Sequence, residues 1–204
     1  MLGMLCVVAG ASGCTFTGAG TKQPQTRPPE STYRPRVECS IGTFGFAWGD
    51  GKLQTSTLDG RLLSGEVMDA WKERGYSVGG RFVWDQEFSG EADYNLILMG
   101  SQRNVASFGL ELLNALTLTI FPYTVTQHYD LTYVLQDVKS KRTYNATVRA
   151  WDVTYVSLLV VPAFPFSNGG HRATMEQIAD SLYQQFRAQG AFEYPCPPAP
   201  TPVS

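Results

Sequence analysis

The clearest regular pattern in this chain is an alternation of apolar and polar residues between Val125 and Ala150. A polar stretch, Asp137 to Lys141, divides the alternation into two runs. The apolar positions of one parity are Val125, Tyr129, Leu131, Tyr133 and Leu135 in the first run, and Tyr144, Ala146, Val148 and Ala150 in the second. A period of two is typical of a strand with one buried face. The pattern therefore predicts a long β-hairpin.

Two other stretches repeat their apolar residues with the period of a helix. The first runs from Ser64, a suitable N-cap, to Arg74, and Gly75 can end it. The second follows Gly169-Gly170 and closes at Gly190. The apolar face of the first helix comprises Leu63, Val67, Met68 and Trp71, and that of the second Met175, Ile178, Ala179, Leu182, Tyr183 and Phe186.

Shorter strands are predicted at residues 41–48, 81–84 and 92–100, where aromatic and aliphatic residues are dense. The element order is thus strand, helix, strand or strands, hairpin and helix. Each helix has one apolar face that must be buried against another element. We therefore expect an α+β fold, an antiparallel or mixed sheet of about four to five strands with two amphipathic helices packed on one face.

Two apolar segments, residues 105–121 and 156–166, flank the hairpin. Polar residues interrupt the first and two prolines the second, and both are too short to span a membrane as a helix. They adjoin the outer ends of the hairpin, so they should lie side by side at one end of the sheet. They either close the core there or form an exposed apolar rim that docks a membrane or a protein. The candidate docking residues are Leu116, Leu118, Ile120, Phe121, Leu158, Leu159, Val160, Phe164 and Phe166.

The first fourteen residues have the layout of an export signal, with an apolar stretch followed by small residues and a cysteine. Ala11-Ser12-Gly13-Cys14 resembles the lipobox of bacterial lipoprotein precursors. The match departs from that pattern at Ala11, where leucine is usual, and no Lys or Arg precedes the apolar stretch. The resemblance implies cleavage before Cys14 and acylation of Cys14. The alternative is an ordinary buried strand with an incidental cysteine.

This interpretation divides the chain into four parts. They are a signal peptide (1–13), a lipidated cysteine with a flexible Pro/Thr-rich tether (14–38), a single α+β domain (39–192) and a Pro-rich tail (193–204). An exported domain meets an oxidising compartment, in which Cys39 and Cys196 can pair as a disulfide. Two unpaired thiols are the alternative.

Composition and motifs exclude several functions. A net charge of −2 and a pI near 5.7 argue against a nucleic-acid partner. Of the two histidines, His128 shares a strand face with Asp130, but no nucleophile is identified beside them, and His171 follows a Gly-Gly turn. We interpret the His128 face as an exposed polar strand face. No spacing typical of a metal or cofactor site occurs, so we expect no catalytic residues, metal or cofactor.

Short motifs carry a further resemblance. Lys-Glu-Arg-Gly-Tyr (72–76) ends the first predicted helix, Ala-Asp-Tyr (92–94) begins a strand, and the hairpin runs through Trp151 into Leu-Leu-Val-Val-Pro (158–162). In these motifs the chain resembles small cell-envelope lipoproteins of Gram-negative bacteria. More distantly, its element order is similar to the LptE family of lipopolysaccharide-assembly lipoproteins. By the sorting pattern of lipoproteins, Thr15 after the cysteine implies the outer membrane.

These inferences lead to one expectation of function. We expect a non-enzymatic outer-membrane lipoprotein that faces the periplasm and is held in the membrane by its lipid anchor. It would be an accessory or binding subunit of a cell-envelope complex, with an envelope protein as its partner. The alternative is a lipid- or small-ligand-binding periplasmic module that uses segments 105–121 and 156–166.

Overall fold

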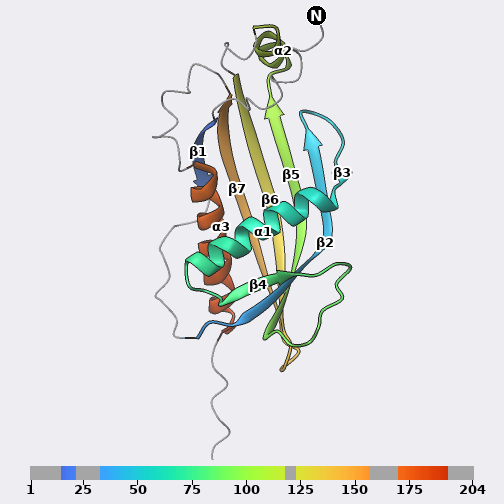
Figure 1. Ribbon diagram of the computed structural model, residues 1–204, viewed down its shortest axis with the longest axis vertical. Helices are drawn as coiled ribbons and strands as arrows, with labels where there is room; N and C mark the ends of the chain where they lie inside the picture. The colour runs from blue at the N-terminus through green and yellow to red at the C-terminus, as the bar shows by residue number, and fades with distance from the viewer. Residues whose placement is uncertain (1–14, 22–32, 118–122, 157–169, 193–204) are drawn as a thin grey trace, which may run out of the picture.

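The computed structural model describes residues 15–21, 33–117, 123–156 and 170–192, and these form a single sheet with three helices (Figure 1). The strands are β1 (Thr15–Thr21), β2 (Arg36–Trp48), β3 (Gln54–Thr55), β4 (Gly79–Phe82), β5 (Tyr94–Ala106), β6 (Tyr123–Asp137) and β7 (Thr143–Val156). The helices are α1 (Thr57–Glu73), α2 (Phe108–Leu116) and α3 (Gly170–Ala188).

The sheet is mixed. Its strand order is β1-β7-β6-β5-β2-β3, and β4 also pairs with β2. β2 runs parallel to β4 and β5, whereas the other neighbours are antiparallel. Helices α1 and α3 lie across the same face of the sheet (Figure 1). The predicted α+β class and helix placement are confirmed, but β1 and the two-residue β3 add strands beyond the predicted four to five.

Strands β6 and β7 form the predicted hairpin. They pair without interruption from Tyr123 opposite Val156 to Gln136 opposite Thr143. At the turn, the Asp137 carboxylate accepts hydrogen bonds from two backbone amides, at 2.8 and 2.9 Å. Short polar side chains that bond the following backbone are typical of such turns. In both strands, the side chains at the alternating apolar positions are buried, as the sequence pattern predicts.

Helix α1 begins earlier than predicted, at Thr57 instead of Ser64. The cap is Ser56, whose hydroxyl accepts a hydrogen bond from the Asp59 backbone amide at 3.3 Å. Ser64 is buried within the helix. The opposite end agrees with the prediction, because Gly75 follows the helix with φ of +75°.

An aromatic cluster joins the two long helices above the sheet. The Trp71 ring meets the rings of Tyr183, Phe186 and Phe192 edge-to-face, with centroids 6.3, 6.2 and 6.0 Å away. Its indole N–H donates to the Ala179 carbonyl at 3.1 Å. Trp71 is fully buried, so α1 and α3 share one core with the sheet.

The predicted tether over residues 14–38 is wrong for two stretches. Thr15–Thr21 is strand β1, paired antiparallel with β7, and β2 starts at Arg36, ahead of the predicted domain start at residue 39. The threonines of β1 show no apolar periodicity, but Thr has a high strand propensity and an edge strand tolerates polar residues. The predicted signal peptide, Cys14 and the Pro-rich tail lie outside the described residues.

The predicted disulfide between Cys39 and Cys196 is not supported. Cys39 is a free thiol, 2% exposed, in the middle of the core. The reason is the register of β2, which places Cys39 beside Leu96 of β5 with α1 packed over the strand. Cys196 lies outside the described residues.

We expect the Cys39 thiol to be inert in the folded protein. Burial raises its pKa to about 12, and the reactive species is the thiolate. Maleimide at pH 8 should therefore label Cys39 only after unfolding in guanidinium, as measured by peptide mass mapping. Native labelling at the unfolded rate would contradict this placement.

Candidate functional site

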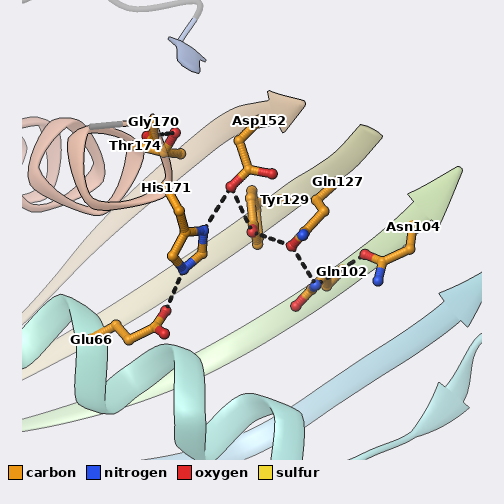
Figure 2. Close-up of polar contacts among 9 residues, drawn as sticks. All are labelled: Glu66, Gln102, Asn104, Gln127, Tyr129, Asp152, Gly170, His171 and Thr174. Carbon is orange, nitrogen blue, oxygen red and sulfur yellow. Dashed lines mark hydrogen bonds and ion pairs between the residues drawn. The ribbon is translucent and has the colours of Figure 1, made fainter. Parts of the chain in front are cut away.

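A polar cluster lies where the start of α3 meets α1 and the sheet (Figure 2). His171, the second residue of α3, places Nδ1 2.7 Å from Asp152 Oδ2 and Nε2 2.9 Å from Glu66 Oε2. Asp152 belongs to β7 and its side chain is fully buried, whereas the Glu66 side chain on α1 is 47% exposed. The imidazole of His171 thus links α1, α3 and β7.

The two carboxylates determine the charge of the ring. Hydrogen bonds to Asp152 and Glu66 raise the pKa of His171 to about 10, although burial acts in the opposite direction. At neutral pH both ring nitrogens are therefore protonated and donate to the carboxylates. A buried carboxylate needs such a partner, because an uncompensated charge in the core is strongly destabilising. Within the described residues, no group of three or more His, Cys, Asp or Glu side chains could hold a metal ion.

Polar contacts continue from Asp152 across three strands (Figure 2). The Tyr129 hydroxyl lies 3.2 Å from Asp152 Oδ2 and 2.7 Å from Gln127 Oε1. The Gln102 amide then donates to Gln127 Oε1 at 3.1 Å and to Asn104 Oδ1 at 3.0 Å. Burial, together with the nearby Asp152 carboxylate, raises the pKa of Tyr129 far above its ordinary range. The tyrosine therefore stays a neutral hydroxyl.

The cluster borders a cavity of about 420 Å³ between α1 and the sheet. The sheet contributes Gln102, Gln127, Tyr129 and Thr154, helix α1 contributes Asp59, Leu62, Leu63 and Glu66, and α3 contributes His171. The volume falls within the range of small-molecule sites, roughly 300–1,000 Å³. Amides, hydroxyls and carboxylates beside two leucines suit a small polar group.

Sequence reasoning missed this site, although the chain carries a signal for it. On three adjacent strands, the residues at core-facing positions change from mainly apolar to mainly polar toward the same end of the sheet. The polar residues at these positions are Gln102 and Asn104 in β5, Gln127 in β6, and Asp152 and Thr154 in β7. The register places Gln102 opposite Tyr129 and Gln127 opposite Asp152. His171 then reaches them from a distant part of the sequence.

The pair that the sequence singled out lies elsewhere. His128 and Asp130 are on the exposed face of β6, away from the helices. Asp130 forms an ion pair with Arg149 of β7 at 3.3 Å, and both side chains are more than half exposed. The interpretation of an exposed polar strand face is confirmed, and neither residue joins the polar cluster.

The structure describes residues 105–117 of the first predicted apolar segment, and helix α2 makes up most of this part. Leu116 is 73% exposed, and Leu110, Leu112 and Leu113 are 39%, 50% and 37% exposed. The other predicted docking residues lie outside the described residues: Leu118, Ile120, Phe121, Leu158, Leu159, Val160, Phe164 and Phe166. The strand ends that lead to them are paired in the sheet, as expected from the hairpin. None of the described helices has the length and hydropathy to cross a membrane.

Removing the His171 imidazole should destabilise the protein in a pH-dependent way. The folded pKa of about 10 lies above the ordinary 6.5, so the stabilisation is complete below pH 6.5 and is lost as pH rises through 10. The ring is 39% exposed, so water screens part of the interaction. For His171→Gln we expect a loss of about 2 kcal/mol at pH 6, between the values for exposed and buried pairs. Urea unfolding at pH 6, 8 and 10 should show the difference between the two proteins shrinking; a constant difference would contradict the assignment.

Comparisons with known proteins give structural similarity only. No family model matches the chain, and no curated protein matches it. PelC from Paraburkholderia phytofirmans, solved as a dodecamer, is similar with 16% identity and a TM-score of 0.36 over 84% of this chain and 97% of PelC. A DUF330 protein from Xanthomonas campestris has 12% identity and a TM-score of 0.37 over 80% and 91% of the two chains. A neuraminyllactose-binding hemagglutinin homologue from Helicobacter pylori has 10% identity and a TM-score of 0.27 over 81% and 84%. At these scores the similarities establish neither a family nor a function.

Proposed function

We propose that this chain is a non-enzymatic binding protein of the outer membrane, anchored by acyl chains on Cys14 and acting as an accessory subunit of a cell-envelope complex. The observation that carries the proposal is the cavity beside His171, whose imidazole is held between the carboxylates of Asp152 and Glu66. The protein binds through the lining of this cavity. The partner or ligand inserts a small polar group into the cavity.

The charge states favour binding over catalysis. A general base works best when its pKa lies near the working pH. His171, with a pKa of about 10, is already protonated at neutral pH, and both ring nitrogens are occupied by carboxylates. Tyr129 holds its proton even more firmly. These groups are therefore suited to present fixed hydrogen-bond partners and not to exchange protons.

The position of β1 supports the anchor. β1 begins at Thr15, directly after Cys14, and Thr15 pairs with Val156 at the end of β7. Acyl chains on Cys14 would therefore lie at the end of the sheet from which the apolar segments emerge. Acylation with a second membrane contact gives stable attachment, which a single short acyl chain does not.

The anchor is tested by the intact mass of the protein purified from its own membranes. We expect the mass of residues 14–204 plus acyl chains, and loss of both the added mass and the membrane association in Cys14→Ser. An unmodified full-length mass would overturn the anchor.

The binding site is tested by native mass spectrometry of the same preparation in mild detergent. Thr154→Val removes a cavity hydroxyl with little change of volume, and Thr124→Val makes the same change at an exposed position of β6. We expect a bound molecule or partner to be retained by wild type and by Thr124→Val, and to be reduced in Thr154→Val. Equal retention in both variants, or none in wild type, would contradict the proposed site.

A further inference from the structure

Helix α2 carries an apolar stripe that the described residues leave largely exposed. At 100° per residue, its four leucines fall within about 160° of the helical wheel, and Glu111 lies outside this arc. All four leucines are more than a third exposed. An exposed stripe of large apolar side chains on an amphipathic helix is typical of an interaction surface.

Among the described residues, the stripe lies outside the hydrophobic core. Among the described elements, the contacts of α2 are few and are mainly with β6. Figure 1 shows α2 beyond the end of the sheet, away from α1 and α3. In the sequence, α2 is followed by the largely apolar residues 118–122, and the apolar residues 157–166 follow β7, whose last residue, Val156, pairs with Tyr123 at the start of β6.

The start of β1 marks the same end. Thr15 pairs with Val156, and Val156 pairs with Tyr123, the first residue of β6. Thr15, which follows Cys14 directly in the sequence, therefore lies at the end of the sheet where α2 is found (Figure 1). The exposed leucines and the start of β1 are therefore at the same end of the sheet (Figure 1).

From this placement we propose that α2 is a membrane-contacting helix whose leucine stripe inserts into a lipid surface. The inference rests on the proposed function only in that a Cys14 anchor would bring α2 to that surface. A lipid surface fits better than a second copy of the chain. The apolar area that four partly exposed leucines on a nine-residue helix can bury is far smaller than the ~800 Å² that each partner buries in a stable dimer. The helix contains no Lys or Arg, so its binding is apolar and not driven by lipid charge.

The test uses a chain that cannot be acylated, residues 15–204, which retains every described strand and helix. We expect it to float with neutral phosphatidylcholine vesicles and to bind equally at low and high salt. Replacing two stripe residues, Leu112→Asp with Leu116→Asp, should lower the partition coefficient at least about tenfold. Circular dichroism checks that each variant is folded.

The matched control makes the same charge change at two exposed leucines away from α2. Leu53 and Leu58 are 51% and 65% exposed, and Leu53→Asp with Leu58→Asp should leave vesicle binding unchanged. Absence of flotation, or equal flotation of the α2 variant, would overturn the inference. So would a dimer that only the α2 variant dissociates, since a second copy would then cover the stripe. If the truncated chain floats with vesicles but the protein from its own membranes has an unmodified full-length mass, the lipid anchor is rejected and the membrane contact of α2 is supported.

Discussion

Replacing Trp71 by alanine should lower the free energy of unfolding by about 4 kcal/mol, the largest effect that we expect from a single side chain. Trp71 is fully buried, meets three aromatic rings and donates its indole N–H to the Ala179 carbonyl. The substitution removes these contacts and opens a cavity between α1, α3 and the sheet. Urea unfolding at neutral pH measures the change.

Trp84 provides the matched control. It is 53% exposed and stacks with Arg61, whose guanidinium carbon lies 4.9 Å from the ring centroid. Trp84→Ala should therefore cost no more than about 1 kcal/mol, the value of an exposed cation–π contact. Similar losses in the two variants would show that Trp71 is not the centre of the core.

Gly100→Ala should destabilise the protein by about 3 kcal/mol or more. Gly100 lies in the middle of β5 with φ of +139°, a conformation that other residues rarely adopt. A Cβ here would lie 2.2 Å from the backbone oxygen of Asp130 and 3.0 Å from the Leu131 Cα, both in the paired strand β6. Backbone atoms cannot rotate away as a side chain would, so β5 and β6 must separate locally.

Gly65→Ala provides the control for the loss of stability expected from Gly100→Ala. Gly65 is exposed in α1, and a Cβ added there would meet no atom within 4 Å. Gly65→Ala should therefore raise the free energy of unfolding by about 0.5–1 kcal/mol, through helix propensity alone. Loss of stability at Gly65, or none at Gly100, would contradict the two backbone placements.

The parts of the fold that the sequence predicted are those with sustained periodicity. The hairpin and the apolar faces around Trp71 and Phe186 follow directly from it. The start of α1 was missed because Leu58 and Leu62 are exposed and blur the amphipathic pattern. β1 was missed because its neighbour is β7, far away in sequence, and local composition does not report such a pairing.

The candidate site was hidden for a related reason. Each polar residue at a core-facing position, such as Gln127 or Asp152, looks like a single break in an alternation. Only the register of β5, β6 and β7 shows that these breaks are neighbours. The arrival of His171 between Asp152 and Glu66 depends on how α3 packs on α1, which no local pattern records.

The pairing of β1 with β7 has a mechanical consequence. If Cys14 is fixed in a membrane, tension along the sheet axis acts at the first residue of β1, and β1 lies antiparallel to β7 over its whole length. The hydrogen bonds between these strands would then be loaded together, in shear, and not opened one after another. Through these hydrogen bonds, β1 would transmit the force to β7, the strand that carries Asp152. Tension on the anchor would thus reach the strand that contributes Thr154 to the cavity lining.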